Sequence, residues 1–566
     1  MLVTDQETNA LKRLGDLHKK EEERLMQTLS DQHGLPYIDL TSVAPEGDAM
    51  RFVTKEDARK ASFAPFKIIG QNLHVGVLSP EGDMTKILLK NLETRGINVV
   101  LYLISHASLE HVYARYDEAK MINQVSSGEI SLSKIETVEL ANSIKTLDDV
   151  AKAFAIVRSA DTAHRTTKLI ETMFSGAVAL RASDIHIESE ESQTKIRYRV
   201  DGVLHDITVL TDKVGKQIAS RLKLLAGLKI SQSHEAQDGR FSLDFKDVSL
   251  EIRVSVIPSN YGDGFVMRLL DPRNVIAHLE EMGMSEVLFQ HIERALAKPH
   301  GIILTTGPTG SGKSTTLYAF VQSVHTSENK VITIEDPIEY HISGISQTQV
   351  DQAKNYTFLS GLRAALRQDP DVIMVGEIRD EETAGVAINA ALTGHLVFST
   401  LHTNTAAGTI PRLLDLKVNP KVIGSALTLA LAQRLVRKLC PHCKEGNTST
   451  EKESRIITTI LGIMLTNKKD EGMLGFKPAL RYTLWRPVGC EFCTHGYKGR
   501  TGIYEAISMS ADIEKLIASN PSEREIRKEA DKQGIPTLKE DGILKVLQGI
   551  TSLEELTRSV DVYGDE

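Results

Sequence analysis

Residues 300–320 read HGIILTTGPTGSGKSTTLYAF, and the interpretation of the whole chain starts from this stretch. Ile302, Ile303 and Leu304 form an apolar run that is typical of a buried strand. The run ends at a glycine-rich loop, and a helical pattern follows the loop. Strand, loop and helix in this order are the context that the phosphate-binding P-loop motif requires. The residues predicted to hold a nucleoside triphosphate are Gly307, Pro308, Thr309, Gly310, Ser311, Gly312, Lys313, Ser314 and Thr315.

The chemistry of the loop supports this prediction. Its three glycines let the backbone curl, so that its N–H groups point inward at phosphate oxygens. Lys313 would reach the β- and γ-phosphates, and the hydroxyl of Ser314 would bind Mg²⁺. The start of the following helix adds partial positive charge. The alternative is an ordinary glycine-rich turn, which does not explain the strand and the helix on either side.

Length and composition describe a globular protein of several domains. The chain has 566 residues, which is enough for about three or four domains that each bury a core. Apolar residues make up 41%, the net charge is −8 and the isoelectric point is about 6.2, so no general attraction to nucleic acid or anionic lipid is indicated. No apolar run of eighteen residues and no signal-peptide core occur. We therefore expect a cytoplasmic protein, and any link to a membrane must come through a partner.

The N-terminal third is predicted to contain a small α/β domain over residues 1–118 and a polar linker over 119–148. A helical surface that docks another protein is the favoured interpretation of the domain. Arg13, Leu14 and Gly15 are similar to the start of a cyclic-dinucleotide-binding motif found in some N-terminal domains. The glycine and apolar pattern that should follow is replaced by HKKEEER, so the docking interpretation is kept.

Residues 149–282 are predicted to form an α+β domain that carries arginines on its strands. A helix over 150–180 is expected first, then the strands SDIHIE and KIRYRV, a second helix and three further strands. Two interpretations of the arginines remain open. They either face solvent on alternate strand positions, or project over a triphosphate and stabilise charge during phosphoryl transfer. The arginines concerned are Arg197, Arg199, Arg240, Arg253 and Arg268.

Three stretches after the P-loop place polar groups at the ends of apolar strands. VITIEDPIEY (331–340) ends in Glu335 and Glu339, either of which could orient or deprotonate an attacking water; we favour Glu339. DPDVIMVGEIRD (369–380) contains Glu377, which would help to hold Mg²⁺ through water. LTGHLVFSTLHTN (392–404) carries two histidines that either sense the γ-phosphate or are satisfied core histidines. These are His395 and His402.

Strands that alternate with helices over 283–438 predict an α/β core with a mainly parallel sheet. The loops at the carboxyl ends of such strands gather where ligands bind. This places the predicted polar groups at one edge of the sheet.

The four cysteines form two CxxC pairs, and every cysteine of the chain is used in them. Four thiolates from two such pairs are the pattern of a closed, structural zinc site. A redox pair or unligated cysteines are the alternatives, and His442 or His495 could replace one thiolate. The ligands expected in this module (439–505) are Cys440, Cys443, Cys490 and Cys493, and short helices are expected over 506–566.

The motifs GPTGSGKST, ITIEDPIEY, DPDVIMVGEIRD and LTGHLVFSTLHTN, in this order, resemble the type II/type IV secretion ATPase superfamily. The resemblance covers about residues 149–505 closely. The tetracysteine module followed by GYKGRTGIYE is most similar to assembly and secretion ATPases, type IV pilus assembly ATPases in particular, rather than to retraction motors.

The resemblance implies a hexameric motor with a RecA-like core, preceded by a PAS-like arginine domain that closes over ATP. It implies Walker A at 307–315, an aspartate box at 335–339, Walker B at 371–377, a histidine box at 395–402, and nucleotide-facing arginines at Arg240, Arg253 and Arg268. This chain reads SQSHEAQDGR at 231–240, where relatives carry further arginines, so additional arginine contacts are not expected there.

The leading hypothesis is an ATPase that uses ATP, Mg²⁺ and structural Zn²⁺ and drives pilus assembly through an inner-membrane platform protein and a recruiting protein. A type II secretion or DNA-uptake pseudopilus ATPase is the alternative. A nucleic-acid translocase is not favoured, because this chain is acidic and lacks a basic, aromatic-rich stripe. A small-molecule kinase would leave the cysteine module and the arginine domain without a role.

Overall fold

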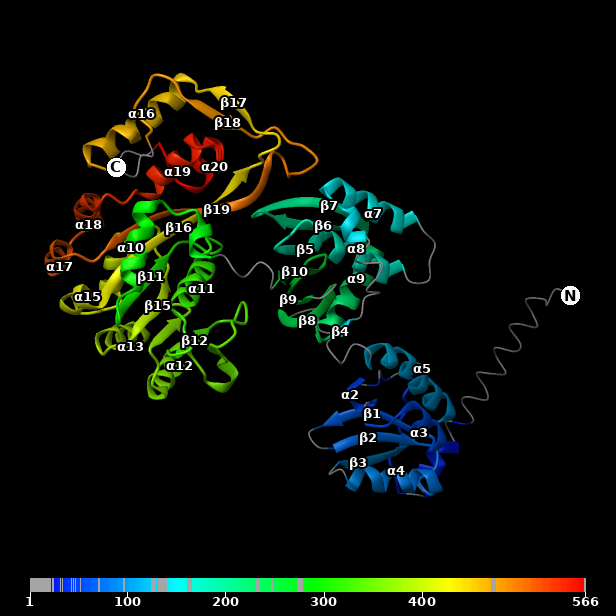
Figure 1. The fold of residues 1–566 in the computed structure, drawn as a ribbon. Helices are drawn as coiled ribbons and strands as arrows, with labels where there is room; N and C mark the ends of the chain where they lie inside the picture. Colours follow the sequence, from blue (N-terminus) through cyan, green and yellow to red (C-terminus); the bar gives the residue numbers. More distant parts are fainter. Residues whose placement is uncertain are drawn as a thin grey trace. The chain divides into compact units, whose positions relative to one another are not determined.

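The fold was analysed in a computed structural model of the chain (Figure 1). The structure describes residues 22–563, apart from positions 23, 24, 31, 33, 42, 44, 46, 51, 70, 71, 95, 96, 124–128, 131–139, 160–164, 231–234, 246, 247, 272–277 and 470–474. The chain divides into two compact units, Met1–Ile130 and Ser131–Glu566.

The first unit is a small α/β fold around a three-stranded sheet in the order β1-β2-β3. β1 and β2 are antiparallel, whereas β2 and β3 are parallel. Buried Phe63, Val75 and Leu103 lie in its core. The motif 13–15 lies outside the described residues. The unit contains α2 (Gly47–Met50), α3 (Lys55–Lys60), β1 (Phe63–Ile69), β2 (Asn72–Val77), α4 (Asp83–Thr94), β3 (Asn98–Leu103), α5 (His106–Asn123) and β4 (Glu129–Ile130).

The arginine-bearing domain is an antiparallel sheet in the order β8-β9-β10-β5-β6-β7 with helices packed on it. Its elements are α7 (Leu147–Ser159), α8 (Arg165–Ala179), β5 (Asp184–Ser189), β6 (Gln193–Val200), β7 (Val203–Thr211), α9 (Asp212–Leu225), β8 (Gln237–Phe245), β9 (Val248–Ser259) and β10 (Gly262–Leu270).

The single helix expected over 150–180 is wrong, because the structure has α7 and α8 in its place. One helix of that length would extend over about 45 Å, beyond the reach of one small sheet. Two helices instead pack against each other, and the missing side chain of Gly176 leaves room for Val150. Both apolar faces are thereby buried.

The main sheet of the second unit has the order β13-β12-β14-β15-β11-β16-β19. Its neighbouring strands are parallel except for the last pair, β16 and β19, which confirms the predicted α/β fold with a mainly parallel sheet. Its strands are β11 (Gly301–Thr306), β12 (Val331–Glu335), β13 (Ser346–Gln349), β14 (Val372–Val375), β15 (Leu396–Leu401), β16 (Leu427–Leu439) and β19 (Tyr497–Ser508).

Buried side chains alternate between the two faces of this sheet, as the two-residue period of a strand requires. Ile302 and Leu304 lie in a core cluster with residues of α12, α13, α14 and α15, whereas Ile303 lies in a second cluster with α10 and α11. The helices are η2 (Leu279–Met282), α10 (Glu286–Leu296), α11 (Lys313–Val324), η3 (Gln352–Lys354), α12 (Phe358–Ala365), η4 (Leu366–Gln368), α13 (Glu381–Leu392), α14 (Thr409–Asp415) and α15 (Pro420–Ala426).

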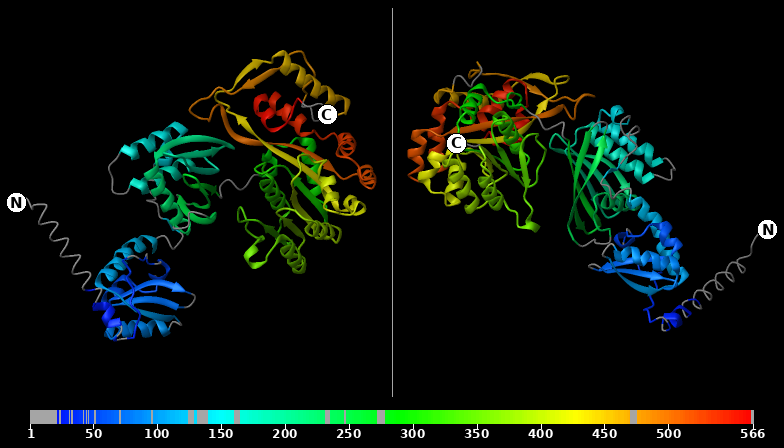
Figure 2. Two further views of the ribbon diagram at one scale, coloured as in Figure 1. Left: turned by 180° about the vertical axis from the view of Figure 1, so that it is seen from behind. Right: turned by 60° about the horizontal axis from the view of Figure 1, so that its bottom comes forward.

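The cysteine-bearing segment leaves the sheet at the end of β16 and returns to it as β19. It contains β17 (Glu445–Thr448), α16 (Glu451–Thr466) and β18 (Thr483–Arg486). The expected short C-terminal helices follow: α17 (Ala511–Ile517), α18 (Glu523–Ala530), η6 (Asp531–Gln533), α19 (Leu538–Leu547) and α20 (Leu553–Ser559). We call the cysteine-bearing segment the arm; it is drawn in yellow to orange in both views of Figure 2, and its helix α16 packs against α19. Across the described part of the chain, none of the helices has the length and apolarity to span a membrane.

Candidate active site at the carboxyl edge of the main sheet

The glycine-rich loop connects β11 to α11, as the sequence predicts. Its glycines adopt positive φ angles, 147° at Gly307, 78° at Gly310 and 90° at Gly312. A Cβ at Gly307 would lie 2.5 Å from the carbonyl oxygen of Gln433, and one at Gly312 would lie 2.6 Å from its side-chain nitrogen. Both conformation and space therefore require glycine at these two positions.

Lys313 lies at the first position of α11, half-buried above the loop. Its Nζ donates to the carbonyl oxygens of Gly307 (2.8 Å) and Pro308 (3.1 Å). Burial lowers the pKa of this ammonium and the charge of Arg434 acts in the same direction, whereas Glu377 opposes them. Within the described residues, the hydrogen-bond partners of Lys313 are neutral carbonyls, which suits this cation to bind an anion such as a phosphate.

The two candidate bases differ in how their carboxylates are occupied. Glu335 is buried and accepts bonds from Tyr318, from Thr333 Oγ1 (2.5 Å) and from Gln347 Nε2 (3.1 Å). In the described part of the chain, the carboxylate of Glu339 accepts one bond, from Arg253 Nη1 at 3.2 Å. Burial raises the pKa of Glu339, although the charges of Arg253 and Arg268 oppose the rise. A carboxylate with free acceptor capacity and a raised pKa is the better general base.

Glu377 and His402 meet at the ends of β14 and β15, where His402 Nε2 lies 3.1 Å from Glu377 Oε2. Burial opposes ionisation of Glu377, but bonds from Arg379 and His402 hold its pKa below the usual range. An ionised carboxylate here could bind a magnesium-bound water. We call Gly307–Thr315, Glu339, Glu377 and His402 the P-loop edge.

His395 does not belong to the P-loop edge. It precedes β15, so the six residues of that strand separate it from His402 by about 20 Å. Its Nδ1 lies 3.0 Å from the carbonyl oxygen of Ala390 at the end of α13. The structure therefore gives His395 the local bonding of a satisfied histidine and leaves His402 beside the loop.

The arginines of the middle domain form a row across neighbouring strands. Arg240, Arg253 and Arg268 lie directly opposite one another on β8, β9 and β10, and the row continues through Asp184 to Arg199. Opposed residues of neighbouring strands share a face, and like charges placed there destabilise a sheet. Asp184 accepts from Arg268 (3.0 Å) and lies 3.4 Å from Arg199, and Arg253 reaches Glu339 and the carbonyl oxygen of Ile338. Arg240 is exposed.

The four cysteines converge as their spacing predicts. Their sulfurs all lie within 4.8 Å of one another, and three of the pairs are separated by 3.7–3.8 Å. A disulfide would need about 2 Å. Four sulfurs placed tetrahedrally around zinc at about 2.3 Å would be about 3.8 Å apart. The cluster is compatible with a zinc site, and the ring of His442 packs against Phe492 of the second CxxC pair.

Two residues beside the loop, Arg434 and Asn404, were not identified from the sequence. Arg434 lies on β16, and its Nη2 donates to the backbone oxygen and to Oδ1 of Asn404, both at 3.1 Å. The sequence contains one signal for it, an arginine within the otherwise apolar strand LTLALAQRLV.

Comparison with known proteins agrees with the motifs. The profile described as Type II/IV secretion system protein matches residues 159–558. Type II secretion system ATPase E of Vibrio cholerae is 46% identical over 392 residues, which cover 69% of this chain and 74% of that protein. Type IV pilus assembly ATPase PilB of Myxococcus xanthus is 36% identical over 544 residues, which cover 95% and 91%.

Among solved structures, the Legionella pneumophila ATPase DotB superimposes with a TM-score of 0.50 at 23% identity, covering 69% of this chain and 94% of that one. This likeness concerns the fold alone. The profile match and the two curated relatives establish the relationship: the chain belongs to the Type II/IV secretion system protein family and is an ATPase of the pilus or secretion assembly kind.

Proposed function

We propose that the chain hydrolyses ATP at the P-loop edge and uses the energy to assemble a type IV pilus. The observation that carries this proposal is the convergence of Lys313, Glu339, Glu377 and His402 at one edge of a parallel sheet, with Arg253 in contact with Glu339. The backbone of the loop and Lys313 would hold the phosphates, and Ser314 would hold Mg²⁺.

Each charged group would have a separate role in cleavage. Glu339 would orient the attacking water and accept its proton, because its carboxylate is the less occupied of the two candidates. Glu377 and His402 would lie on the side of the magnesium ion and the γ-phosphate. Arg253 and Arg268, with Arg240 as the third member of their row, would stabilise the charge that develops on the phosphoryl group.

The choice of a pilus is supported by the extent of similarity. The pilus assembly relative aligns over 95% of this chain, including the N-terminal domain, whereas the more identical type II secretion relative aligns over 69%. We further propose a homohexamer with RecA-like cores, at the cytoplasmic face of the inner membrane, which works through a platform protein and a recruiting protein. A type II secretion role is the second candidate, favoured by the higher identity over the motor.

Deletion of the gene and complementation with wild type or Lys313→Ala would separate the two functions. We expect the deletion strain to lose its surface fibres while it secretes proteins normally. Wild type should restore the fibres, and Lys313→Ala should not. Intact fibres with blocked secretion would transfer the assignment to type II secretion, and normal levels of both would contradict the proposal.

The cysteine cluster would hold one structural zinc ion that fixes the start and the end of the arm. Metal analysis of the purified chain should find about one zinc per chain, and Cys490→Ser with Cys493→Ser should lose it. Zinc at wild-type content in the double variant would contradict the ligand assignment.

A further inference from the structure

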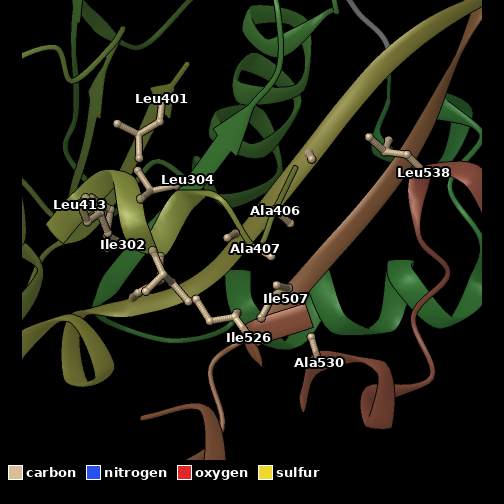
Figure 3. Packing of buried hydrophobic residues seen from close by; sticks show 14 of the residues in the cluster. Ile302, Leu304, Leu401, Ala406, Ala407, Leu413, Ile507, Ile526, Ala530 and Leu538 are labelled. Carbon is tan, nitrogen blue, oxygen red and sulfur yellow. The ribbon is translucent and has the colours of Figure 1, made fainter. Parts of the chain in front are cut away.

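The segment that follows β15 is buried at its far end and more exposed at its beginning, where hydrogen bonds hold it. Ala406 and Ala407 are buried among Ile507, Ile526 and Ala530 (Figure 3). The carboxylate of Glu505 also accepts the N–H of Ala406 at 2.6 Å. The beginning of the segment, His402 to Asn404, is exposed or half-buried and carries a group of the P-loop edge.

Hydrogen bonds from the P-loop strand and from β16 connect this beginning to the rest of the site. The N–H of Thr403 donates to Thr306 Oγ1 at 2.8 Å, at the end of the P-loop strand. Arg434 binds Asn404 twice with one nitrogen, at the backbone oxygen and at Oδ1. β16 is hydrogen-bonded beside β11, with Ala432 opposite Thr306, so Arg434 extends from the strand that neighbours the P-loop.

The guanidinium of Arg434 has an unusual set of partners. Burial lowers its pKa, and Glu505 is the opposing charge. Its Nη1 is buried and has no hydrogen-bond partner within the described residues. Arg437, three residues further on the same strand, binds Glu555 through Nε (2.9 Å) and Nη2 (2.6 Å) and stacks on Tyr497. An incompletely partnered buried donor costs stability, so its presence beside a site calls for a functional reason.

The charge of Arg434 also acts on the P-loop itself, since it lowers the pKa of Lys313. Because the two cations repel each other, binding of a polyanion near both of them is electrostatically favourable.

We propose that Arg434 is a positioning residue for ATP hydrolysis, which holds His402–Asn404 beside the P-loop and adds positive potential for the triphosphate. This inference rests on the ATP site proposed above. It separates two effects: the bonds to Asn404 set the geometry of His402, and the charge sets affinity.

Four variants test the two effects separately, by steady-state hydrolysis and by equilibrium binding of fluorescent ATP. Asn404→Ala and Arg434→Lys keep the charge and weaken the bonds, so kcat should fall about tenfold with the ATP Kd within about twofold of wild type. Arg434→Gln should lower kcat and also weaken ATP binding about three- to tenfold. Arg455→Gln, an exposed arginine of α16 paired with exposed Glu451, is the matched control and should change neither.

Wild-type kcat in both Asn404→Ala and Arg434→Lys, or an unchanged Kd in a folded Arg434→Gln, would overturn the proposal. If Arg434→Gln does not fold, the kcat of Asn404→Ala tests the proposal, because this variant removes only an exposed amide. Lys313→Ala, measured in parallel, distinguishes a failure of the proposed ATP site from a failure of the role proposed for Arg434. If Lys313→Ala still hydrolyses ATP, the proposed site itself is wrong. If Lys313→Ala is inactive while the other variants are normal, only the role of Arg434 is wrong.

Discussion

Lys313 at the P-loop edge and Lys469 in the C-terminal region, by which we mean the chain after β16, have opposite kinds of partner. In the C-terminal region the side chain of Lys469 is fully buried and contacts Asp531 at 2.7 Å and Glu540 at 2.8 Å. At the P-loop edge, Lys313 donates to the backbone carbonyls of Gly307 and Pro308. Two charged groups act on its pKa, and one of them, Arg434, is a second cation. The difference indicates that opposite charges in mutual contact stabilise the fold, whereas cations held among neutral partners are available to a charged substrate.

The largest expected effect is the loss of a P-loop cation. Lys313→Ala should reduce ATP hydrolysis about 10³-fold or more, since the lysine stabilises phosphate charge in the transition state. The thermal melting temperature should stay within about 2 °C of wild type, because within the described residues the hydrogen-bond partners of Lys313 are two neutral carbonyls. Phosphate release and differential scanning fluorimetry measure the two quantities. A large drop in melting temperature would show that Lys313 stabilises the fold, as Lys469 is expected to do, and would contradict the contrast between the two lysines.

The next effect compares two carboxylates of the same stretch. Glu339→Gln should lower kcat about 10²- to 10³-fold, because the amide cannot accept a proton from water. Glu335→Gln, in a side chain already bonded by Tyr318, Thr333 and Gln347, should act mainly on stability. Single-turnover hydrolysis of both variants measures this. Activity lost only in Glu335→Gln would reverse the assignment.

The C-terminal region should show the converse behaviour. Lys469→Ala leaves Asp531 and Glu540 without their cation and should destabilise the C-terminal region by about 3–5 kcal/mol. Trp485, the single tryptophan, lies on β18 and reports this transition in urea by fluorescence. Lys532→Ala, an exposed lysine paired with Glu529, is the control and should cost less than about 1 kcal/mol. Equal losses in the two variants would show that Lys469 contributes no more than a surface pair.

The smallest effect is a displacement of the pH profile. Glu339 must be ionised to accept a proton, so kcat/KM should fall as pH drops through its raised pKa. The charge of Arg253 lowers that pKa, so Arg253→Gln should move the acidic limb to higher pH, besides lowering the rate. The residual kcat/KM of the variant against pH measures the limb, with Arg455→Gln as control. A limb that stays in place or moves to lower pH would contradict Glu339 as the base.

Elements set by local pattern could be predicted from the sequence. The apolar run 302–304, the glycines after it and the CxxC spacing each impose structure within a few residues, and the strand, loop, helix and cysteine cluster appear as expected. The parallel sheet followed from the alternation of strands and helices.

Features set by strand register could not be predicted. Arg240, Arg253 and Arg268 form a row only because three strands align at those residues. The length of β15 places His395 and His402 at opposite edges, although both flank one apolar run. Arg434 reaches Asn404 across thirty residues of sequence, which no periodicity reveals.

The most direct test of the account is the chemical identity of the nucleotide that Glu339→Gln protein retains after incubation with Mg²⁺ and ATP. If the P-loop edge binds ATP and Glu339 activates the water, the retained nucleotide is ATP. Retained ADP at the wild-type level, or a protein that retains no nucleotide at all, would contradict the account.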